Sequence, residues 1–556
     1  MNILKSKIIY LFALLLFVGC ADNKNVLLDP NIVRVHIMND PESLNPQCRR
    51  GALAGHIIQH LYQKLLSLDH KTNQLVPVLA NSQPIIEILD DGRLKLSLEI
   101  RKEAKWDNGK EITAEDVLFS IKLLKMPWVK NEHFKPYFEK VENVLIDEEL
   151  PKKVSIIFKE AYIQAKWCLP DLFILPAHII DPEGILKKVN IESIKNRNFG
   201  EDSLAAMNVA MRFSSDDFQR NGDFVKGSGA YRLKEWYSGN RIILERKKEW
   251  WGDKMSHENI YFNAYPTKII YEHIKSWAQV IVSVKKGLLD VVSMLPSKDF
   301  FILKDTKSFN EQYNTAVSDR NAFEYIGINL KQEYLEDLRL REALSSITNT
   351  ESIISDVLLG MGSPIKSPYF AIKELYHDKL VKRSYDPKQA EGLLKSAGWT
   401  DSNNDGLLDK TINGDLKVLK LKMIYNAENS RRENIGLVLK EEARKVGIDL
   451  ELIAMEWSVY LEALRNHNYD LFIGGLGTSP QPPDPKQLWH TESYYNNGSN
   501  YFGFGDADTD QLIEDIRICM EKDEMRSKMF LLQEEIHDVI PCIFLYSLKN
   551  KIIIHN

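Results

Sequence analysis

The sequence has few cysteines, little net charge and, beyond its first nineteen residues, no long apolar run. Five Cys in 556 residues exclude a fold that depends on a disulfide framework. The net charge of −6, from 72 Lys and Arg against 78 Asp and Glu, lacks the basic excess of a nucleic-acid-binding protein. No later segment approaches the roughly 18 uncharged apolar residues of a transmembrane helix, so we expect no membrane span in the body of the chain.

The short motifs of common enzyme and metal sites are also missing. The sequence contains no GxxxxGK[ST] nucleotide loop and no HExxH, CxxC or GxSxG motif. Its 13 His are scattered, without the spacing of zinc ligands. We therefore expect a protein that is not an enzyme, needs no cofactor and has no nucleic-acid partner.

The composition is that of an ordinary folded protein. The chain is 44% hydrophobic and 27% charged, with 28 Gly and 21 Pro, which excludes a disordered or low-complexity chain. At roughly 150 residues per domain, the length predicts about three or four domain-sized units. A sizeable core is therefore expected without disulfides.

The N-terminus has the pattern of a targeting segment. Lys5 and Lys7 precede an uncharged apolar run from Ile8 to Val18, which is too short to span a bilayer. The ending Phe17-Val18-Gly19-Cys20 resembles a bacterial lipoprotein signal, with Phe17 where Leu is usual. In such signals the Cys is lipid-modified and becomes the new N-terminus. The alternative is an ordinary signal peptide in which Cys20 is incidental.

We predict that residues 1–19 are a signal peptide and residues 20–30 a lipid-anchored tether. The mature protein would be exported and held at a membrane through Cys20, facing the periplasm or the cell exterior. The sequence does not say which membrane.

The body mixes strands and helices. Residues 33–37 and 94–100 alternate apolar and polar side chains, which is typical of strands. Thr113 followed by Asp116 predicts a helix start. Two further helices, over residues 390–397 and 437–446, end at Gly398 and Gly447, and residues 448–453 again have the pattern of a strand. Helix–Gly–strand units of this kind predict α/β lobes, connected by ordered strands.

One segment is similar to the first part of a calcium-binding EF-hand loop. Oxygen-bearing side chains occupy its positions 1, 3, 5 and 9, with Gly at position 6, but position 12 is Ile412 rather than Glu. The alternative is a surface turn whose side chains cap the local backbone. The candidate calcium ligands are Asp401, Asn403, Asp405 and Asp409.

A series of short motifs, in order along almost the whole mature chain, resembles one known family. It is the extracellular solute-binding protein family 5, which comprises the oligopeptide-, dipeptide- and nickel-binding proteins of ABC transporters. The motifs are Asp40 to Pro46, Leu61 to Leu66, Leu75 to Ala80, Ile100 to Lys102, Lys105 to Gly109, Thr113 to Val117, Gly227 to Tyr231, Trp250 to Gly252, Asp337 to Leu344, Ala390 to Trp399 and Asp484-Pro485.

The resemblance implies a two-lobed α/β fold, the periplasmic-binding-protein-like fold of type II, cluster C, with an extra subdomain on the first lobe. The chain would cross between the lobes twice. We expect the first lobe to comprise residues 31–67, 216–317 and 540–556, the extra subdomain residues 68–215, and the second lobe residues 318–539.

The resemblance also implies a function. The protein would be a solute-binding lipoprotein of an ABC import system, a monomer that captures a peptide or another small solute between its lobes. It would deliver that solute to an ABC permease in the membrane. The alternative is a surface receptor or another non-transport binding protein on the same scaffold.

The resemblance implies the following ligand-binding residues. Arg50, Gly51 and Ala52 would pair with the backbone of an extended ligand, and Trp457 would line side-chain pockets. Where many peptide-binding members have the Asp that binds the α-amine of a peptide, this chain has Gln481, or Ser479 if the gap is placed differently. The ligand could therefore be an N-blocked peptide, a glycan fragment, another small solute or a metal chelate. Nothing in the sequence pairs Cys48, Cys168, Cys519 and Cys542.

Overall fold

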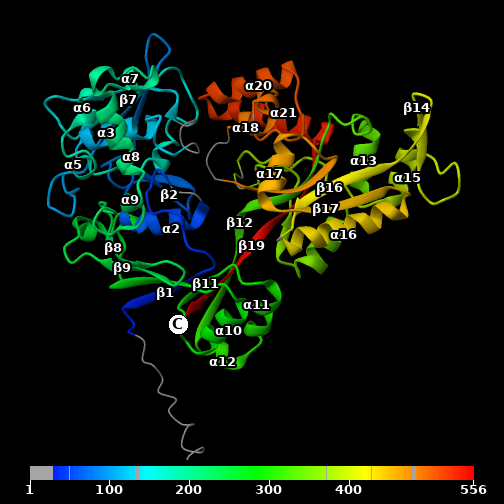
Figure 1. Ribbon diagram of the computed structural model, residues 1–556, viewed down its shortest axis with the longest axis horizontal. Coiled ribbons are helices and arrows are strands. Elements are labelled where there is room, and N and C mark those ends of the chain that lie inside the picture. Colours follow the sequence, from blue (N-terminus) through cyan, green and yellow to red (C-terminus); the bar gives the residue numbers. More distant parts are fainter. Residues whose placement is uncertain are drawn as a thin grey trace, which may run out of the picture.

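The computed structural model describes residues 29–48, 51–131, 138–370, 372, 374–427, 429–478, 484–496 and 498–556. Figure 1 shows the predicted α/β architecture of two lobes joined at their base by long strands. The predicted signal peptide, Cys20 and most of the predicted tether lie outside the described residues. Nothing in the structure tests the limits predicted for the lobes and the extra subdomain, and these stay a prediction.

The first lobe is organised on five strands in the order β11-β1-β10-β9-β8. β1 runs parallel to β10 and β11, whereas β9 is antiparallel to both of its neighbours. The strands are β1 (Ile32–Ile37), β8 (Tyr231–Tyr237), β9 (Arg241–Arg246), β10 (Lys268–His273) and β11 (Val291–Ser293). Three helices pack together beside β11 and the C-terminal strand; they are α10 (Trp277–Lys285), α11 (Ser297–Lys304) and α12 (Lys307–Asn310).

A second body continues from the first lobe (Figure 1). It contains a hairpin of β2 (Leu66–Asp69) and β3 (Gln74–Pro77) and a sheet in the order β4-β5-β7-β6, with β4 (Ile85–Ile88), β5 (Leu94–Glu99), β6 (Val141–Ile146) and β7 (Lys153–Phe158). Its helical segments and those that tie it to the first lobe are α2 (Gly51–Leu61), α3 (Ala114–Lys125), η1 (Leu169–Asp171), α5 (Ala177–Ile180), α6 (Ile185–Lys188), α7 (Ile191–Lys195), η2 (Gly200–Asp202), α8 (Ser203–Phe213), α9 (Asp216–Arg220), η3 (Trp251–Met255) and η4 (Ile260–Phe262).

The second lobe has a sheet with helices on both faces. Its strands follow the order β17-β16-β18-β12-β19, and they are β12 (Tyr313–Ile328), β16 (Lys420–Asn426), β17 (Asp449–Met455), β18 (Leu471–Gly477) and β19 (Cys542–His555). One face packs on α13 (Leu338–Ser346), η5 (Ile353–Val357), α15 (Pro387–Ser396) and α16 (Ser430–Lys445). The other packs on α17 (Trp457–Arg465), α18 (Lys486–Trp489), α20 (Ala507–Ile518) and α21 (Lys522–Val539). The remaining short elements are α14 (Thr350–Ser352), α19 (Glu492–Tyr495), β13 (Gly362–Pro364), β14 (Asp409–Ile412) and β15 (Asp415–Val418).

Several local predictions are confirmed. Thr113 and Asp116 form a capping box at the start of α3. Gly398 and Gly447 end α15 and α16 with φ of +87° and +80°, backbone angles that favour glycine because they would strain any residue with a Cβ. These glycines turn the chain from each helix toward the following strand.

Two long strands, β12 and β19, carry the chain from one lobe to the other. They pair antiparallel at Tyr313–Asp319 with Lys549–His555 in the first lobe, and at Phe323–Gly327 with Cys542–Ser547 in the second. Between these stretches residues 320–322 of β12 leave the ladder. The connection is therefore ordered, as predicted, with one irregularity where the lobes meet and a second register shift between Glu324 and Tyr325. We call residues 317–322 and 547–552 the junction.

A close contact between two strands of the second-lobe sheet leads to a prediction about stability. A Cβ added at Gly327 would lie 2.1 Å from Cε1 of Phe472 on the paired strand β18, so Gly327→Ala should lower the free energy of unfolding by roughly 1–3 kcal/mol. The control is Gly392→Ala in α15, where a Cβ meets no atom within 4 Å and which should stabilise by up to about 1 kcal/mol. Chemical denaturation measures both, and equal effects would contradict the role given to Gly327.

Candidate ligand-binding site between the lobes

The carboxyl ends of the parallel strands of both lobes point toward the junction. In the first lobe β11 ends at Ser293, opposite Ile552; in the second, β18 ends at Gly477, beside Ala322 of the irregular segment. Ile552 is only five positions along β19 from Ser547, which pairs with β12 in the second lobe, or about 17 Å of extended chain. Open α/β sheets bind ligands beyond the carboxyl ends of their strands, so the region over the junction is the candidate site.

Trp457 lies at the carboxyl edge of the second lobe. It begins α17 directly after β17, and the side chain of Glu456 caps the helix by accepting a hydrogen bond from the backbone N–H of Ser458 at 2.8 Å. The indole stacks on Tyr460 with ring centroids 5.7 Å apart and stays 50% exposed. A large aromatic held rigidly with one face open is suited to contact a ligand, although its predicted role in lining pockets stays a prediction.

The other predicted ligand residues are placed only in part. Gly51 begins α2, with Ala52 in its first turn. Arg50, Ser479 and Gln481 lie outside the described residues. The structure therefore does not test whether the predicted ligand-binding residues lie together, and their roles stay predictions.

A buried carboxylate with two arginines, which the sequence analysis missed, lies at the same edge as Trp457. Glu324 of β12 is 3% exposed and accepts hydrogen bonds from Nε and Nη2 of Arg431 at 2.9 and 2.7 Å. The Tyr546 hydroxyl donates to the same carboxylate, and Arg432 donates to it at 3.5 Å and to Asn426 at 2.8 Å. Burial alone would raise the pKa of Glu324, but the hydrogen bonds and charge of Arg431 hold it below its usual value.

The sequence contains a signal for this cluster. Arg431 and Arg432 lie in the first turn of α16, where the helix dipole disfavours cations. Glu324 is the lone charge in the apolar run from Ala322 to Ile328. Each of the two patterns indicates a charge that needs a partner.

The two lobes also touch directly, away from the junction. Tyr162, in the loop between β7 and η1, donates a hydrogen bond from its hydroxyl to Oδ2 of Asp484 in the second lobe at 3.2 Å. The backbone N–H of Ile163 donates to the carbonyl of Arg517 at 3.0 Å. Arg517 Nε in turn contacts both oxygens of Asp484, at 3.0 and 3.1 Å. We call this set of four residues the rim contact.

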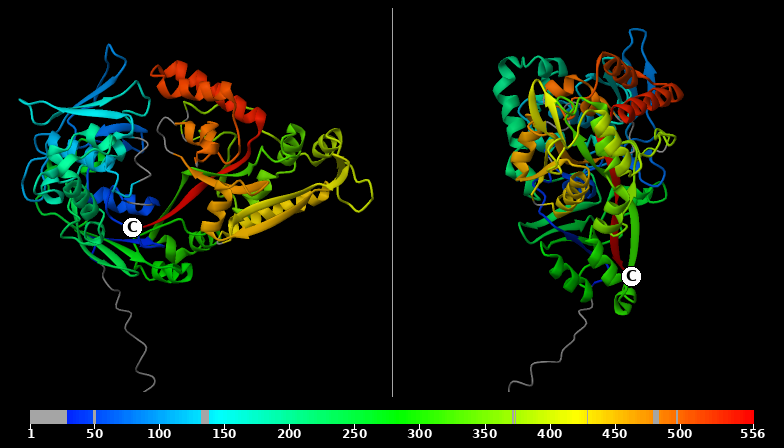
Figure 2. Two further views of the ribbon diagram at one scale, coloured as in Figure 1. Left: turned by 45° about the horizontal axis from the view of Figure 1, so that its top comes forward. Right: turned by 90° about the vertical axis from the view of Figure 1, so that its right-hand side faces the viewer.

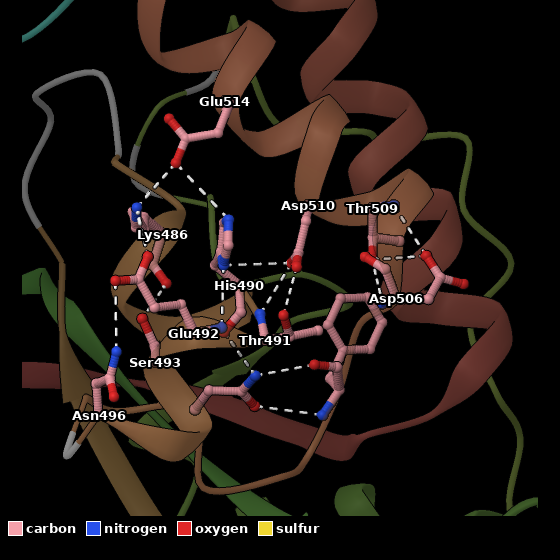
Figure 3. A network of polar contacts seen from close by, with 12 residues as sticks. Lys486, His490, Thr491, Glu492, Ser493, Asn496, Asp506, Thr509, Asp510 and Glu514 are labelled. Atoms are coloured by element: carbon pink, nitrogen blue, oxygen red, sulfur yellow. Dashed lines mark hydrogen bonds and ion pairs between the residues drawn. The ribbon is translucent and has the colours of Figure 1, made fainter.

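A network of charged side chains fixes the second-lobe half of the rim contact (Figure 3). Lys486 Nζ lies 2.8 Å from Glu492 and 2.9 Å from Glu514 of α20. His490 lies between Asp510 and Glu514. The segment that follows Asp484 is thereby held on the helix that carries Arg517.

The predicted calcium ligands serve as backbone caps. Asp401 accepts hydrogen bonds from the N–H groups of Asp405 and Gly406, Asn403 also accepts from Asp405, and Asp409 accepts from Ser402. These hydrogen bonds fit the alternative given above, a turn capped by its own side chains, and the calcium role stays a prediction. Among the described residues, no three His, Cys, Asp or Glu side chains gather in a group suited to a metal ion.

In the part of the chain that the structure describes, Cys168, Cys519 and Cys542 are free thiols. Burial raises the pKa of Cys168 and Cys542, which keeps both protonated and unreactive at neutral pH.

A cavity of about 220 Å³ lies between the first lobe and the second body, and none of its lining residues comes from the second lobe. Gln63, Phe173 and Tyr231 are among its lining residues, together with His60. Burial lowers the pKa of His60 to about 4, so its ring is neutral at physiological pH. The cavity is separate from the candidate site.

Two α/β lobes whose strand ends converge on a shared junction define a binding protein of the two-lobed type. The model of the family described as bacterial extracellular solute-binding proteins, family 5 Middle, matches residues 74–499, and this chain belongs to that family. The predicted family and fold are confirmed.

Known proteins of similar sequence and structure are binding proteins. The chain is 28% identical to the oligopeptide-binding protein AppA of Bacillus subtilis, over 88% of this chain and 81% of AppA. The structure of AppA in complex with a nonapeptide matches with a TM-score of 0.69 at 26% identity, covering 94% of both chains. The dipeptide-binding protein of Escherichia coli is 23% identical over 91% of this chain and 87% of its own length.

A solved structure with a different bound compound shares the fold. NikA from Brucella suis in complex with Fe(III)-EDTA has a TM-score of 0.74 at 18% identity, with 95% of each chain covered. Among the helices that the structure describes, none is both long enough and apolar enough to cross a membrane.

The rim contact yields a prediction. Tyr162→Phe removes a hydrogen bond that exists only while the lobes touch, so ligand affinity should fall threefold to tenfold, since such a bond contributes about 0.5–1.5 kcal/mol. The matched control is Tyr261→Phe, which removes a hydrogen bond to the Leu68 carbonyl on the first-lobe side and should leave affinity unchanged. Calorimetric titration measures both, and an equal loss in the two variants would exclude a role in closure.

Proposed function

We propose that this protein captures a peptide or peptide-like solute between its lobes and delivers it to an ABC permease. The observation that carries the proposal is the convergence of both sets of strand ends on the junction, with the half-exposed Trp457 at the carboxyl edge of the second lobe. The family membership and the peptide-binding relatives support it.

The two-lobed form gives the proposal a physical mechanism. A solute that contacts both lobes binds the closed form more tightly than the open form, and this difference in affinity shifts the population toward closure. The irregular residues 320–322 supply a point at which the connecting strands bend. A permease that recognises the closed form would then accept loaded protein in preference to empty protein.

The class of ligand follows from the residue at the position where many peptide-binding members of the family have an Asp. Gln481 or Ser479 stands where an Asp would bind a peptide α-amine. The nearby Asp484, a conceivable substitute, already pairs with Arg517 and accepts hydrogen bonds from Tyr162 and from the backbone of Lys486. An ammonium left without a charged partner in a closed site is costly. We propose that the ligand is not held through a free α-amine.

Titration with matched peptides tests the proposal. A nonapeptide mixture and its N-acetylated counterpart should bind equally well by calorimetry, because neither Gln481 nor Ser479 supplies a negative charge for the amine. Small-angle scattering at saturation should give a smaller radius of gyration than the empty protein. A preference of tenfold or more for the free amine would contradict the ligand class, and an unchanged radius with bound peptide would favour a rigid receptor. If neither mixture binds, the proposal of a peptide ligand fails.

We further propose that the protein is anchored by lipid at Cys20, on the strength of the short apolar run that ends in Gly19-Cys20. Cys20→Ser should move the protein from the membrane fraction to the soluble fraction, because one lipidated residue provides the attachment. Immunoblots of fractionated cells measure this, with Cys48→Ser as the control that should stay with the membrane. Retention of Cys20→Ser at the membrane would refute the anchor.

A further inference from the structure

The cavity between the first lobe and the second body lies apart from the site of the proposed function, because none of its lining residues comes from the second lobe. Its volume is about 220 Å³. Since an apolar cavity of roughly 150 Å³ holds one benzene molecule, this cavity has room for a molecule of about nine non-hydrogen atoms. Its lining includes the exposed residues Gln59, His70 and Asn263, and the cavity therefore opens to solvent on that side.

A close approach of two backbone segments forms one wall of the cavity. The N–H of Gly229 donates a hydrogen bond of 2.9 Å to the carbonyl of Leu61, the last residue of α2. A Cβ at Gly229 would lie 2.4 Å from the carbonyl oxygen of His60, so glycine is needed for the segment before β8 to lie against α2. This contact holds the first-lobe residue Tyr231 beside the helix that carries His60.

Aromatic rings give the cavity apolar walls. The hydroxyls of Tyr231 and Tyr261 donate hydrogen bonds to backbone carbonyls at 2.9 and 2.6 Å. The indole N–H of Trp250 donates to a third backbone carbonyl at 2.8 Å. Because the polar ends of these side chains already have partners, the three rings offer the cavity mainly their carbon surface.

Three polar side chains of one short stretch, His60, Gln63 and Ser67, line the cavity without using their hydrogen-bonding capacity. Gln63 and Ser67 are each 6% exposed, and Gln63 Oε1 is buried without a hydrogen-bond partner. The ring of His60 makes an edge contact with Tyr231, with centroids 5.7 Å apart. Within the described chain, neither this ring nor the Ser67 hydroxyl forms a hydrogen bond. Unpaired buried polar groups are costly, so a ligand that pairs with them would gain affinity.

The lining is suited to a neutral molecule. Burial lowers the pKa of His60 to about 4, so its imidazole is neutral at physiological pH and has one donor and one acceptor nitrogen. The Ser67 hydroxyl can donate and accept, and Gln63 Oε1 can accept. Lys64 and Asp171, which also line the cavity, carry opposite charges. An uncharged ligand that both donates and accepts hydrogen bonds matches this lining.

We propose that this cavity is a binding site for a small neutral polyhydroxy compound of the size of a monosaccharide. Its hydroxyl groups would form hydrogen bonds with His60, Gln63 and Ser67, and its C–H groups would pack on the rings of Tyr231 and Trp250. The bound compound would join the first lobe to the second body without touching the second lobe. The inference goes beyond the proposed function and does not depend on it.

Calorimetric titration with two compounds of one ring skeleton tests the site. D-xylose in its pyranose form is tetrahydropyran with hydroxyl groups on the ring. D-xylose should bind saturably at millimolar concentration. Tetrahydropyran should bind about tenfold more weakly or less, because the three polar side chains would stay unpaired. Absence of D-xylose binding, or equal affinity for the two compounds, would overturn the proposal.

Two glutamine variants link the binding to the cavity. Gln63→Met keeps the length of the side chain and removes the unpartnered acceptor, so affinity for D-xylose should fall about threefold to tenfold. The matched control is Gln47→Met, which removes another buried amide with an unpartnered Oε1 that does not line the cavity. It should leave the affinity for D-xylose unchanged. Wild-type affinity in Gln63→Met, or an equal loss in both variants, would overturn the proposal.

A variant that fills the cavity separates this site from the one between the lobes. Ala264 is 9% exposed and lines the cavity, so the larger side chain of Ala264→Leu should occupy the space and abolish binding of D-xylose. Peptide titrations should give the same result in this variant as in the wild type, whatever that result is. D-xylose binding that persists in folded Ala264→Leu would place the compound elsewhere and overturn the proposal. If this variant does not fold, Gln63→Met decides the question.

Discussion

The paired strands β12 and β19 are the constraint on which the rest of the structure depends. A hydrogen-bonded ladder resists shear and stretching, so the lobes can move relative to each other only where the ladder is interrupted. The ladder is interrupted at residues 320–322, opposite a single residue of β19, and its register shifts again between Glu324 and Tyr325. Bulges of this kind bend and twist a strand locally. The same two strands bring together the carboxyl end of β11 in the first lobe and the carboxyl end of β18 in the second (Figure 2).

Glu324, next to this interruption, is a buried carboxylate that is stabilised by its partners in the second lobe. Burying a carboxylate is costly, and the attraction of a partner compensates only when its geometry is good. Two hydrogen bonds from Arg431 and one from Tyr546 meet that requirement. A buried ion pair of this kind adds little net stability, but removing one partner is strongly unfavourable. The cluster therefore ties the start of α16 to both connecting strands, since Glu324 lies on β12 and Tyr546 on β19.

Sequence reasoning succeeded where the signal is local. Three features depend on residues that are close in the sequence: the capping box at Thr113, the glycines at positions 398 and 447 and the alternating strand over residues 94–100. An ordered set of short motifs identified the family and fold. The site was harder because its contacts join distant segments: Tyr162 and Asp484 are 322 positions apart. A local pattern can also fit two structures. The sequence of residues 401–409 resembles a calcium-binding loop, but the same spacing of Asp and Asn also caps a turn.

The rim and the junction differ in what they contribute to closure. The rim contact has two hydrogen bonds between the lobes, worth about 1–3 kcal/mol together, or a population shift of roughly fivefold to 150-fold. Moving an equilibrium from 1:99 to 99:1 requires about 5.5 kcal/mol, so the rim alone cannot make closure decisive. The remainder has to come from a solute that contacts both lobes.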